Sequence, residues 1–343
     1  MKILIFFLTS ICIFGCKKEN KDEQIFNFKK GFFIVNEGNF TYGNSSISFY
    51  DFFKKEVINN IFYKANKIPL GDVAMDLKIY DGKCFITINN SGCIYIVDPS
   101  TFKLKSTIKN LTSPRYMVKI NDSIMYVTDL YNPSIYLINI KKLKIENTIF
   151  IGKSTESLVK KNNFVFITSW SFNDKVYIID IEKQKLIDSI KVGLQPCNIV
   201  IDKNEDLWVL CDGGYEGNPI GYENPSLYKI NGKNLTIEKI IKLKRTKFQA
   251  SSLIIDPNGE NLYFINEHIY KLSIYDTIPN LFIVNHEKNF YSLAISPNND
   301  FLIVCDAKNF LNFGTIFIYT INGNLIEKHN VGIIPRTITF LGF

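Results

Sequence analysis

The sequence predicts an all-β protein, a seven-bladed β-propeller of four-stranded antiparallel blades. The first observation is a short strand of alternating apolar and polar residues that recurs along the chain. The second is that the segments between its copies contain further short strands separated by turn residues. The third is the abundance of Phe (28) and Tyr (18), bulky residues that suit the faces between packed sheets.

The recurring strand has seven copies at a nearly constant interval. They are "ISFYD" at 47, "IYIVD" at 94, "IYLIN" at 135, "VYIID" at 176, "LYKIN" at 227, "IYKLS" at 269 and "IFIYT" at 316. A period of roughly 40 to 50 residues built from short strands is typical of propeller blades. Because one blade cannot bury both of its faces, neighbouring blades must pack sheet against sheet.

The strands of single units can be read in order. The N-terminal segment supplies "GFFIVNE" (31–37), "SISFYD" (46–51) and "EVINNIF" (56–62), whereas the last unit has only one strand, "RTITFLG" (336–342). Together they make four strands, so we expect the two ends of the chain to share a blade and close the ring. A complete unit has strands at 115–120, 124–129, 135–140 and 145–151.

The start of the chain, "MKILIFFLTSICIFGC", is interpreted as a lipoprotein signal peptide over residues 1–15. Its apolar run is shorter than the about 20 residues that a membrane span needs. "IFGC" resembles the bacterial lipobox, which implies that Cys16 carries the lipid; the alternative is a plain secretory signal with an accidental cysteine. Residues 16–30 are expected to form a flexible tether and 31–343 the propeller. "KKENKDEQ" (17–24) resembles the surface-export signal of Bacteroidetes lipoproteins, which implies a protein held at the bacterial outer membrane by its lipid anchor alone.

Charge and cysteines exclude several classes of protein. The formal charge of +7 is spread over scattered lysines, which indicates a solvated surface and no nucleic-acid partner. The cysteines beyond the leader do not have metal-ligand spacing and do not form a disulfide framework. If 197–201 pairs with 207–211, Cys197 faces Cys211 in register, and a disulfide there is a testable hypothesis.

Function is expected where the repeats differ, on one face of the ring. The loops between the second and third strands and the loops between blades emerge together there, and they carry aromatic rings, amides and two arginines. Exposed rings need a ligand or local packing, so they indicate either a large flat ligand or plugs folded back on the loops. The candidate ligand-binding residues on this rim are Phe40, Tyr42, Asn90, Arg115, Tyr131, Trp170, Phe172, Tyr215, Tyr222, Phe248, Phe310 and Arg336.

Catalysis has little support in the sequence. The three histidines are scattered, and no nucleophile elbow, zinc-protease motif or phosphate loop is present. A central metal held by Glu37, Asp72 and Asp212 is an alternative, although such carboxylates are more often hydrogen-bonded plugs. We expect a protein that is not an enzyme and has no catalytic, metal or cofactor site.

Several motifs resemble a known family. "YVTD" (126–129) resembles the motif of the YVTN-repeat β-propellers, with Asp129 in place of the final Asn, and "NEGNF", "NNSG", "SPRYM" and "LWVLCDGG" resemble surface lipoprotein propellers of Bacteroidetes. The resemblance implies capture of cobalamin or another corrinoid and its transfer to a TonB-dependent outer-membrane transporter. Two alternatives stay open, an adhesion propeller that binds protein or glycan and a metal-dependent hydrolase similar to propeller lactonases.

Overall fold

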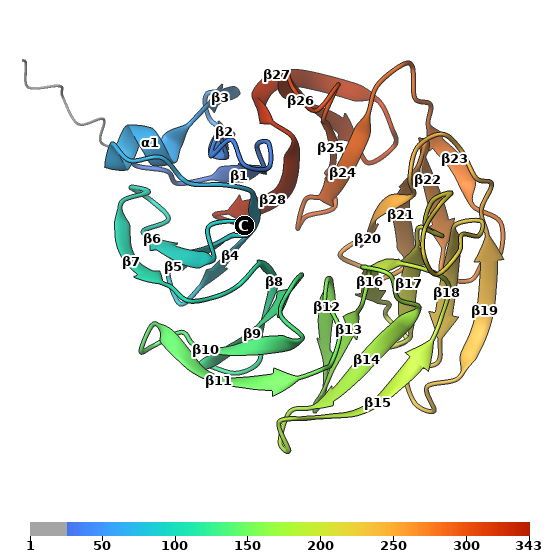
Figure 1. Ribbon diagram of the computed structural model, residues 1–343. Helices are drawn as coiled ribbons and strands as arrows, with labels where there is room; N and C mark the ends of the chain where they lie inside the picture. The colour runs from blue at the N-terminus through green and yellow to red at the C-terminus, as the bar shows by residue number, and fades with distance from the viewer. Residues whose placement is uncertain (1–25) are drawn as a thin grey trace, which may run out of the picture.

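The computed structural model describes residues 26–343, which form seven four-stranded antiparallel sheets around a central axis (Figure 1). This confirms the predicted seven-bladed β-propeller. The only helix within the described range is α1 (Ile61–Asn66). Among these residues no helix is long and apolar enough to cross a membrane.

In every blade the first strand lies nearest the axis and the fourth lies outermost. Blade 1 contains β28 (Pro335–Leu341), β1 (Gly31–Asn36), β2 (Ser46–Asp51) and β3 (Glu56–Ile58). Blade 2 contains β4 (Ala74–Tyr80), β5 (Lys83–Ile88), β6 (Cys93–Val97) and β7 (Leu104–Ile108). Blade 3 contains β8 (Pro114–Lys119), β9 (Ile124–Asp129), β10 (Ser134–Asn139) and β11 (Lys144–Phe150). Blade 4 contains β12 (Leu158–Lys161), β13 (Phe164–Thr168), β14 (Lys175–Asp180) and β15 (Lys185–Lys191).

The remaining blades follow the same order. Blade 5 contains β16 (Pro196–Ile201), β17 (Leu207–Cys211), β18 (Ser226–Ile230) and β19 (Ile237–Lys242). Blade 6 contains β20 (Ser251–Ile255), β21 (Asn261–Asn266), β22 (His268–Ser273) and β23 (Asn280–Ile283). Blade 7 contains β24 (Phe290–Ile295), β25 (Phe301–Asp306), β26 (Phe313–Thr320) and β27 (Leu325–Ile333).

The ring closes where the two ends of the chain meet, as expected. β1 lies between β28 and β2, so that Phe33 is opposite Thr339 on one side and Phe49 on the other. This pairing gives β1 two hydrogen-bonded neighbours and removes the free edges that an open ring would leave.

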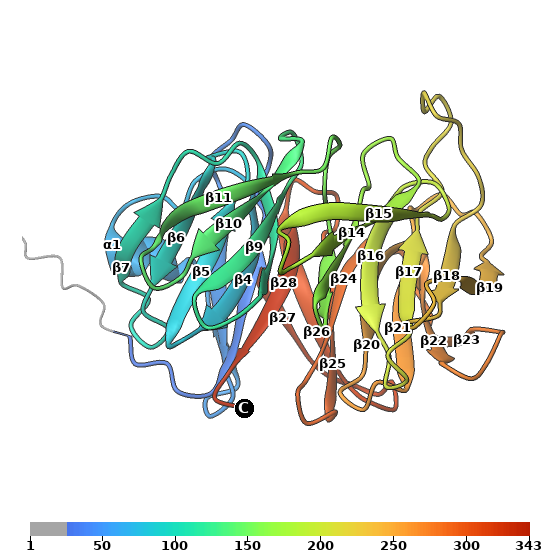
Figure 2. The same cartoon turned by 90° about the horizontal axis from the view of Figure 1, so that it is seen from below.

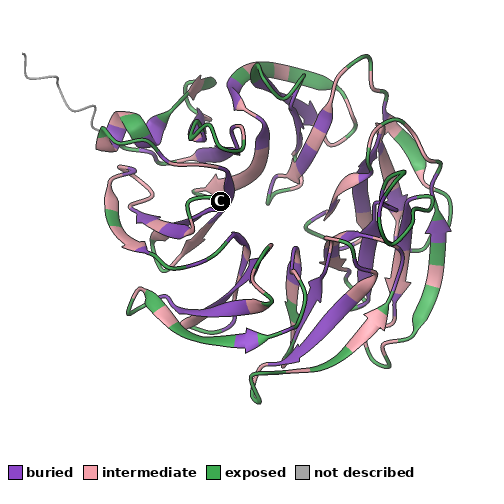
Figure 3. Ribbon diagram, in the orientation of Figure 1, coloured by how far each residue is buried: buried purple, intermediate pink, exposed green. Residues whose placement is uncertain are grey.

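The core lies between the blades. The second and third strands of each blade are largely buried, whereas the outermost strands carry much of the exposed surface (Figure 3). Between blades 2 and 3, for example, Phe85 and Ile96 pack in one cluster with Met125 and Ile138. The repeated strand therefore recurs because every interface between blades needs its apolar side chains.

The expected strand over 56–62 is wrong after Ile58. Asn60 adopts the left-handed conformation (φ 56°), and α1 begins at the next residue. The helix buries Phe62, whose ring stacks on Tyr95 of blade 2 at 5.2 Å. Residues buried on one side of a helix are three or four positions apart in the sequence, whereas residues on one face of a strand are two positions apart. The alternation expected for a strand therefore does not describe this segment.

The expected tether over 16–30 also needs correction. Phe26 and Phe28 are buried, and the ring of Phe28 lies 4.2 Å from that of Phe49 in blade 1. The backbone N–H of Phe28 donates to the carbonyl of Ser100 at 2.8 Å. Residues 26–28 thus pack on blades 1 and 2. The signal peptide assigned to residues 1–15 and the lipidated Cys16 lie outside the described residues.

The hypothetical disulfide between Cys197 and Cys211 is wrong, because both are free thiols. β16 and β17 do pair, but their register shifts so that Pro196 lies opposite Cys211 and Asn198 opposite Leu210. Cys197 is left in a β-bulge, and its Sγ contacts the carbonyl of Leu210 at 3.4 Å. Burial raises the pKa of both thiols well above the usual value.

The loops after the second and fourth strands of every blade emerge on one side, because successive strands are antiparallel. We call this side the loop face; it lies at the upper edge of Figure 2. Its longest loop between paired strands of one blade, residues 212–225, joins β17 to β18. The innermost strands begin at the loop face.

Candidate ligand-binding site

A cavity of about 990 Å³ occupies the centre of the ring. It opens among the loops of the loop face and runs along the innermost strands β20, β24 and β28. Its volume is at the upper end of the range of about 300–1,000 Å³ typical of small-molecule sites. The side chains on which the argument depends are Glu37, Arg115, Tyr116, Glu156, Trp170, Asp212, Phe248, Tyr291, Phe310 and Arg336. We call this space the central cavity.

Arg336, the second residue of β28, is at the centre of a network that crosses the axis. Its Nε and Nη2 donate to the Tyr116 hydroxyl at 2.9 and 2.6 Å, and its Nη1 donates to the Tyr291 hydroxyl at 2.8 Å and to Glu37. The Tyr291 hydroxyl donates to Glu37 Oε1 at 3.0 Å. Burial and the nearby Glu37 carboxylate raise the pKa of Tyr291, which keeps this hydroxyl protonated.

Arg115 forms the second charged pair of the network. Its Nε and Nη2 donate to the two carboxylate oxygens of Glu156 at 2.8 and 2.5 Å, and its Nη1 contacts Met75 Sδ at 3.2 Å. Arg336 Nη2 lies 3.8 Å from Glu156 Oε1, which connects the two pairs. Two guanidinium groups thus face two carboxylates, and blades 1, 2, 3 and 7 and the loop before blade 4 are joined at the cavity. All three guanidinium nitrogens of Arg115 have partners within the chain.

Trp170 and Asp212 form a third contact in the wall. The indole Nε1 of Trp170 donates to Asp212 Oδ2 at 2.7 Å, and the backbone N–H of Gly214 donates to Oδ1 at 2.7 Å. Burial raises the pKa of Asp212 to about 6, although these hydrogen bonds and the charge of Arg245 oppose the shift. The Asp212 carboxyl therefore titrates close to neutral pH.

The raised pKa of Asp212 predicts a dependence of stability on pH. Its folded-state pKa lies above the unfolded value of about 3.9, so the folded protein binds this proton more tightly. The stability gained from this proton is fully present below about pH 4 and is lost as pH rises through about 6. Asp212→Asn should remove a loss of about 2–3 kcal/mol between pH 4 and 7, measured by denaturant unfolding of both proteins.

Fluorescence provides a second readout of the same titration. We expect an emission change with a midpoint near pH 6 that is absent from Asp212→Asn and from Trp170→Phe. Identical pH dependence of unfolding in the wild type and Asp212→Asn would contradict the assignment.

Exposed aromatic side chains lie on the loop face, and one of them, Phe310, also lines the central cavity. Each of them is at least 40% exposed, and Tyr42 and Tyr131 reach 74% and 67%. Two of these rings also pack locally, because the Phe310 ring lies 5.7 Å from that of Tyr291 and the Tyr222 ring lies 5.0 Å from the Arg245 guanidinium. We call the whole set the rim aromatics: Phe40, Tyr42, Tyr131, Phe172, Tyr215, Tyr222 and Phe310.

Hydrogen bonds between loops fix the positions of several rim aromatics. Asn39 Nδ2 donates to the carbonyl of Phe310 at 2.6 Å, which joins the loops of blades 1 and 7. Asp72 Oδ2 accepts from the backbone N–H of Thr41 at 2.9 Å and from Asn90 Nδ2 at 2.5 Å, which joins blades 1 and 2. The rim is thus held by the protein itself, with no ligand needed to order these loops.

The long loop 212–225 is held from below by Arg245. The guanidinium donates to the carbonyls of Gly213 and Gly214, each at 3.1 Å, and lies 5.0 Å from the centre of the Tyr222 ring. These hydrogen bonds from Arg245 hold the loop backbone in place, and with it the aromatic side chains that the loop carries.

The structure divides the candidate residues into two sets. One set lines the central cavity: Arg115, Trp170, Phe248, Phe310 and Arg336. The other set lies on the loop face outside the cavity lining: Phe40, Tyr42, Asn90, Tyr131, Phe172, Tyr215 and Tyr222. Their roles as ligand contacts stay predictions.

The three carboxylates considered for a metal have protein partners instead. Glu37 is paired with Arg336, Asp212 with Trp170, and Asp72 accepts from Thr41 and Asn90. Within residues 26–343 no group of three or more His, Cys, Asp or Glu side chains is placed to hold a metal ion.

Sequence reasoning missed Tyr116, Glu156, Tyr291 and Arg245 as site residues. The first three immediately follow or end the loops between blades, in "SPRY", "STE" and "NFY". That position is a usable signal, because each innermost strand starts beside the axis. Arg245 has no comparable signal, since its carbonyl partners belong to a loop with no counterpart in the other blades.

A model of a protein family described as a domain of unknown function, DUF5074, matches residues 30–332. The chain belongs to this family. The match covers every strand except the last residue of β27 and the whole of β28, so the DUF5074 domain here is a β-propeller. A search of curated proteins finds no match.

Solved structures share the fold of this DUF5074 protein. One, from Bacteroides thetaiotaomicron and described as a quinonprotein alcohol dehydrogenase-like protein, is 19% identical with a TM-score of 0.72, covering 92% of this chain and 79% of its own. The periplasmic gluconolactonase of Pseudomonas aeruginosa is 12% identical with a TM-score of 0.68, covering 91% and 99%. A functionally unknown protein from Desulfotomaculum acetoxidans is 15% identical with a TM-score of 0.66, covering 91% and 98%. At these identities the similarity shows the fold alone.

Proposed function

We propose that this protein binds a large planar ligand, a corrinoid such as cobalamin, on the loop face and passes it to a TonB-dependent transporter. The observation that carries the proposal is the set of exposed rim aromatics on the same face as a central cavity of about 990 Å³. Aromatic faces of this kind bind a wide flat molecule by stacking, while polar groups between them bind its edge.

The polar groups of the site suit a ligand whose edge carries amides. The Arg115 and Arg336 guanidinium groups are neutralised by Glu156 and Glu37, so the deep part of the cavity has little net charge. Amide and hydroxyl groups such as those of Asn198, Gln249 and Ser251 line the wall nearby. A ligand with neutral amide arms can exchange hydrogen bonds with these groups without leaving a charge unpaired.

Anchoring by a lipid on Cys16 would keep the receptor beside a transporter in the same membrane. Because both proteins are held in one membrane, the receptor is present at a high effective concentration near the transporter, which favours transfer of the captured ligand. In this proposal the protein is a lipid-anchored component of the bacterial outer-membrane surface and is not an enzyme.

A titration of the purified protein with cobalamin tests the proposal. We expect one-to-one binding with a dissociation constant of about 1 μM or tighter, seen as heat and as quenching of tryptophan fluorescence. Trp170→Ala and Tyr131→Ala should each weaken binding about tenfold or more, because each removes a ring from the stacking surface. Phe53→Ala is the control for Tyr131→Ala, since Phe53 is an exposed ring (74%, against 67% for Tyr131) on the opposite face.

Absence of heat and of specific quenching at high micromolar cobalamin would reject the corrinoid assignment. Equal affinity in the wild type, Trp170→Ala and Tyr131→Ala would reject the loop face and its central cavity as the site. If cobalamin fails, a screen of protein and glycan partners and a lactone hydrolysis assay test the two other classes of function.

A further inference from the structure

The fourth strand of each blade forms the outer edge of its sheet. The strands β3, β7, β11, β15, β19, β23 and β27 each have a hydrogen-bonded neighbour on one side only. Such an edge can pair with a strand of another chain, and proteins usually prevent this with charged side chains on the edge. Within residues 26–343, six of these strands carry at least one exposed charged side chain: Glu56, Lys105, Glu146, Asp188, Glu238 and Lys328.

The strand β23 is the exception. Its sequence, NLFI, contains no charged residue, and the strand lies at the outer rim of the ring (Figure 1). Leu281 on this strand is 53% exposed. Ile278, shortly before the strand, is 75% exposed, and Val284, directly after it, is 43% exposed. We call β23 together with Ile278 and Val284 the blade 6 edge.

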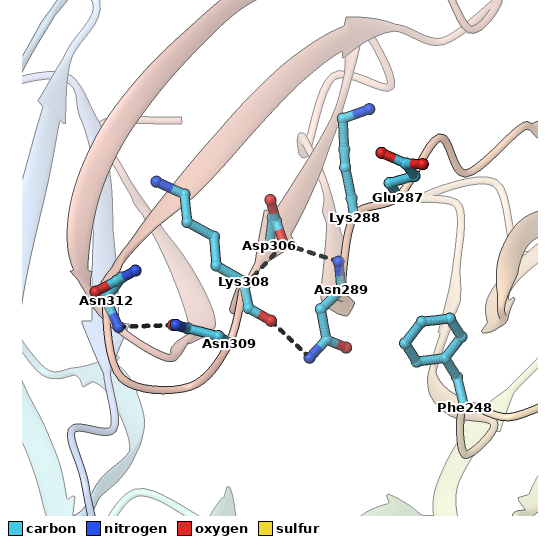
Figure 4. Close-up of a pocket in the computed structure, with 8 residues that line it drawn as sticks. All are labelled: Phe248, Glu287, Lys288, Asn289, Asp306, Lys308, Asn309 and Asn312. Carbon is cyan, nitrogen blue, oxygen red and sulfur yellow. Dashed lines mark hydrogen bonds between the residues drawn. The ribbon is translucent and has the colours of Figure 1, made fainter.

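The chain after the blade 6 edge turns toward blade 7. The side-chain oxygen of Asn285 accepts from the backbone N–H of Lys288 at 2.8 Å, and the Lys288 ammonium lies 5.5 Å from the centre of the Phe317 ring of blade 7. In Figure 4, the same loop leads on to Asn289, whose backbone N–H donates to Asp306 of blade 7 at 3.0 Å. The charge of Lys288 is therefore directed away from the edge.

The chain before the blade 6 edge is held on blade 5. Lys239 Nζ donates to the carbonyl of Asp276 at 2.9 Å, and Lys203 Nζ lies 5.4 Å from the centre of the Tyr275 ring. Because both ends of the edge are fixed within one molecule, pairing with another strand requires little additional ordering. Pro279 has no backbone N–H, which limits the pairing to the strand itself.

A second copy of this chain suits the blade 6 edge. A twofold axis between two copies places their β23 strands antiparallel, so that each apolar strand meets the apolar strand of the other copy. At the six other edges the same arrangement would bring identical charged side chains close together, which opposes pairing. An acidic or basic partner would find no charge of opposite sign on β23.

We propose that two copies of this protein associate through the blade 6 edge, with their β23 strands paired antiparallel in one eight-stranded sheet. A four-residue strand buries less than the about 1,600 Å² typical of stable complexes, so the dimer is weak and reversible. The proposal does not depend on corrinoid binding, because no residue of the blade 6 edge lines the central cavity.

Sedimentation velocity of the purified protein at about 1–300 μM tests the proposal. We expect a shift from monomer to dimer with a dissociation constant of about 10–100 μM. Leu281→Lys should weaken association more than about tenfold, because it places a charge on the edge as in the other blades. Its unfolding midpoint should match that of the wild type, since Leu281 is exposed. Leu325→Lys is the matched control, because Leu325 is also 53% exposed and lies on β27, an edge that already carries charges.

Hydrogen exchange measures the strand pairing itself. The amides of β23 should exchange more slowly at the high end of this concentration range than at the low end, whereas those of β27 should not change. A monomer at every concentration would overturn the proposal. A dimer that Leu281→Lys leaves intact, or one that leaves exchange in β23 unchanged, would also overturn it. Assemblies that grow beyond two copies would contradict the twofold contact.

Discussion

Replacement of Arg115 by methionine is expected to destabilise the folded protein by about 3–5 kcal/mol, because it leaves a buried carboxylate without its charged partner. The Glu156 side chain is 5% exposed and receives two hydrogen bonds from Arg115. Arg336 Nη2, 3.8 Å away, is too distant to replace them. Denaturant unfolding of the single variant, followed by circular dichroism, measures the change.

A double variant separates charge from packing. Arg115→Met combined with Glu156→Leu removes both charges and keeps two side chains of similar length in the wall. We expect it to recover most of the lost stability, because removal of both members of a buried pair costs far less than removal of one. If the double variant is as unstable as the single one, the effect comes from packing and the proposed role of the charge is wrong.

Replacement of Phe33 by alanine is expected to cost about 3–5 kcal/mol, the usual range for a fully buried phenylalanine. Phe33 is 0% exposed and lies on β1, the strand through which the ring closes. Its ring contacts Phe49 at 4.9 Å, Phe102 at 5.1 Å and Phe28 at 5.9 Å, so the cavity would open between blades 1 and 2.

Thermal and denaturant unfolding check the Phe33 prediction. Phe53→Ala is the control with the same chemical change, and its 74% exposed ring should give a change within about 0.5 kcal/mol. Similar effects of the two substitutions would contradict the view that closure depends on this aromatic cluster.

Local patterns in the sequence were sufficient to predict the propeller scaffold. The alternation of "IYLIN" and "VYIID" makes one face of each strand apolar, and β10 and β14 form at those positions. The single strand 336–342 and the three near the N-terminus indicated closure, which β28 and β1 confirm. The strand expected over 56–62 was wrong after Ile58. The short helix α1 begins at Ile61, and the spacing between buried residues changes there from that of a strand to that of a helix.

The site was predictable only in part. The loop face and the exposed rings such as Tyr42 and Tyr131 follow from strand order and composition, so they could be named in advance. The partners of Arg336 could not, because Glu37 and Tyr116 lie 299 and 220 residues away in the sequence. A local sequence pattern does not predict which side chains from different blades contact each other at the axis of the propeller.

The sequence by itself determined the number of blades, the shared blade that closes the ring and the face on which the loops gather, because these depend on a repeated local period. Only the tertiary structure decided that Arg115 and Arg336 are paired with carboxylates and that Cys197 lies in a bulge away from Cys211. These features depend on distances between blades, which arise when seven sheets pack around one axis.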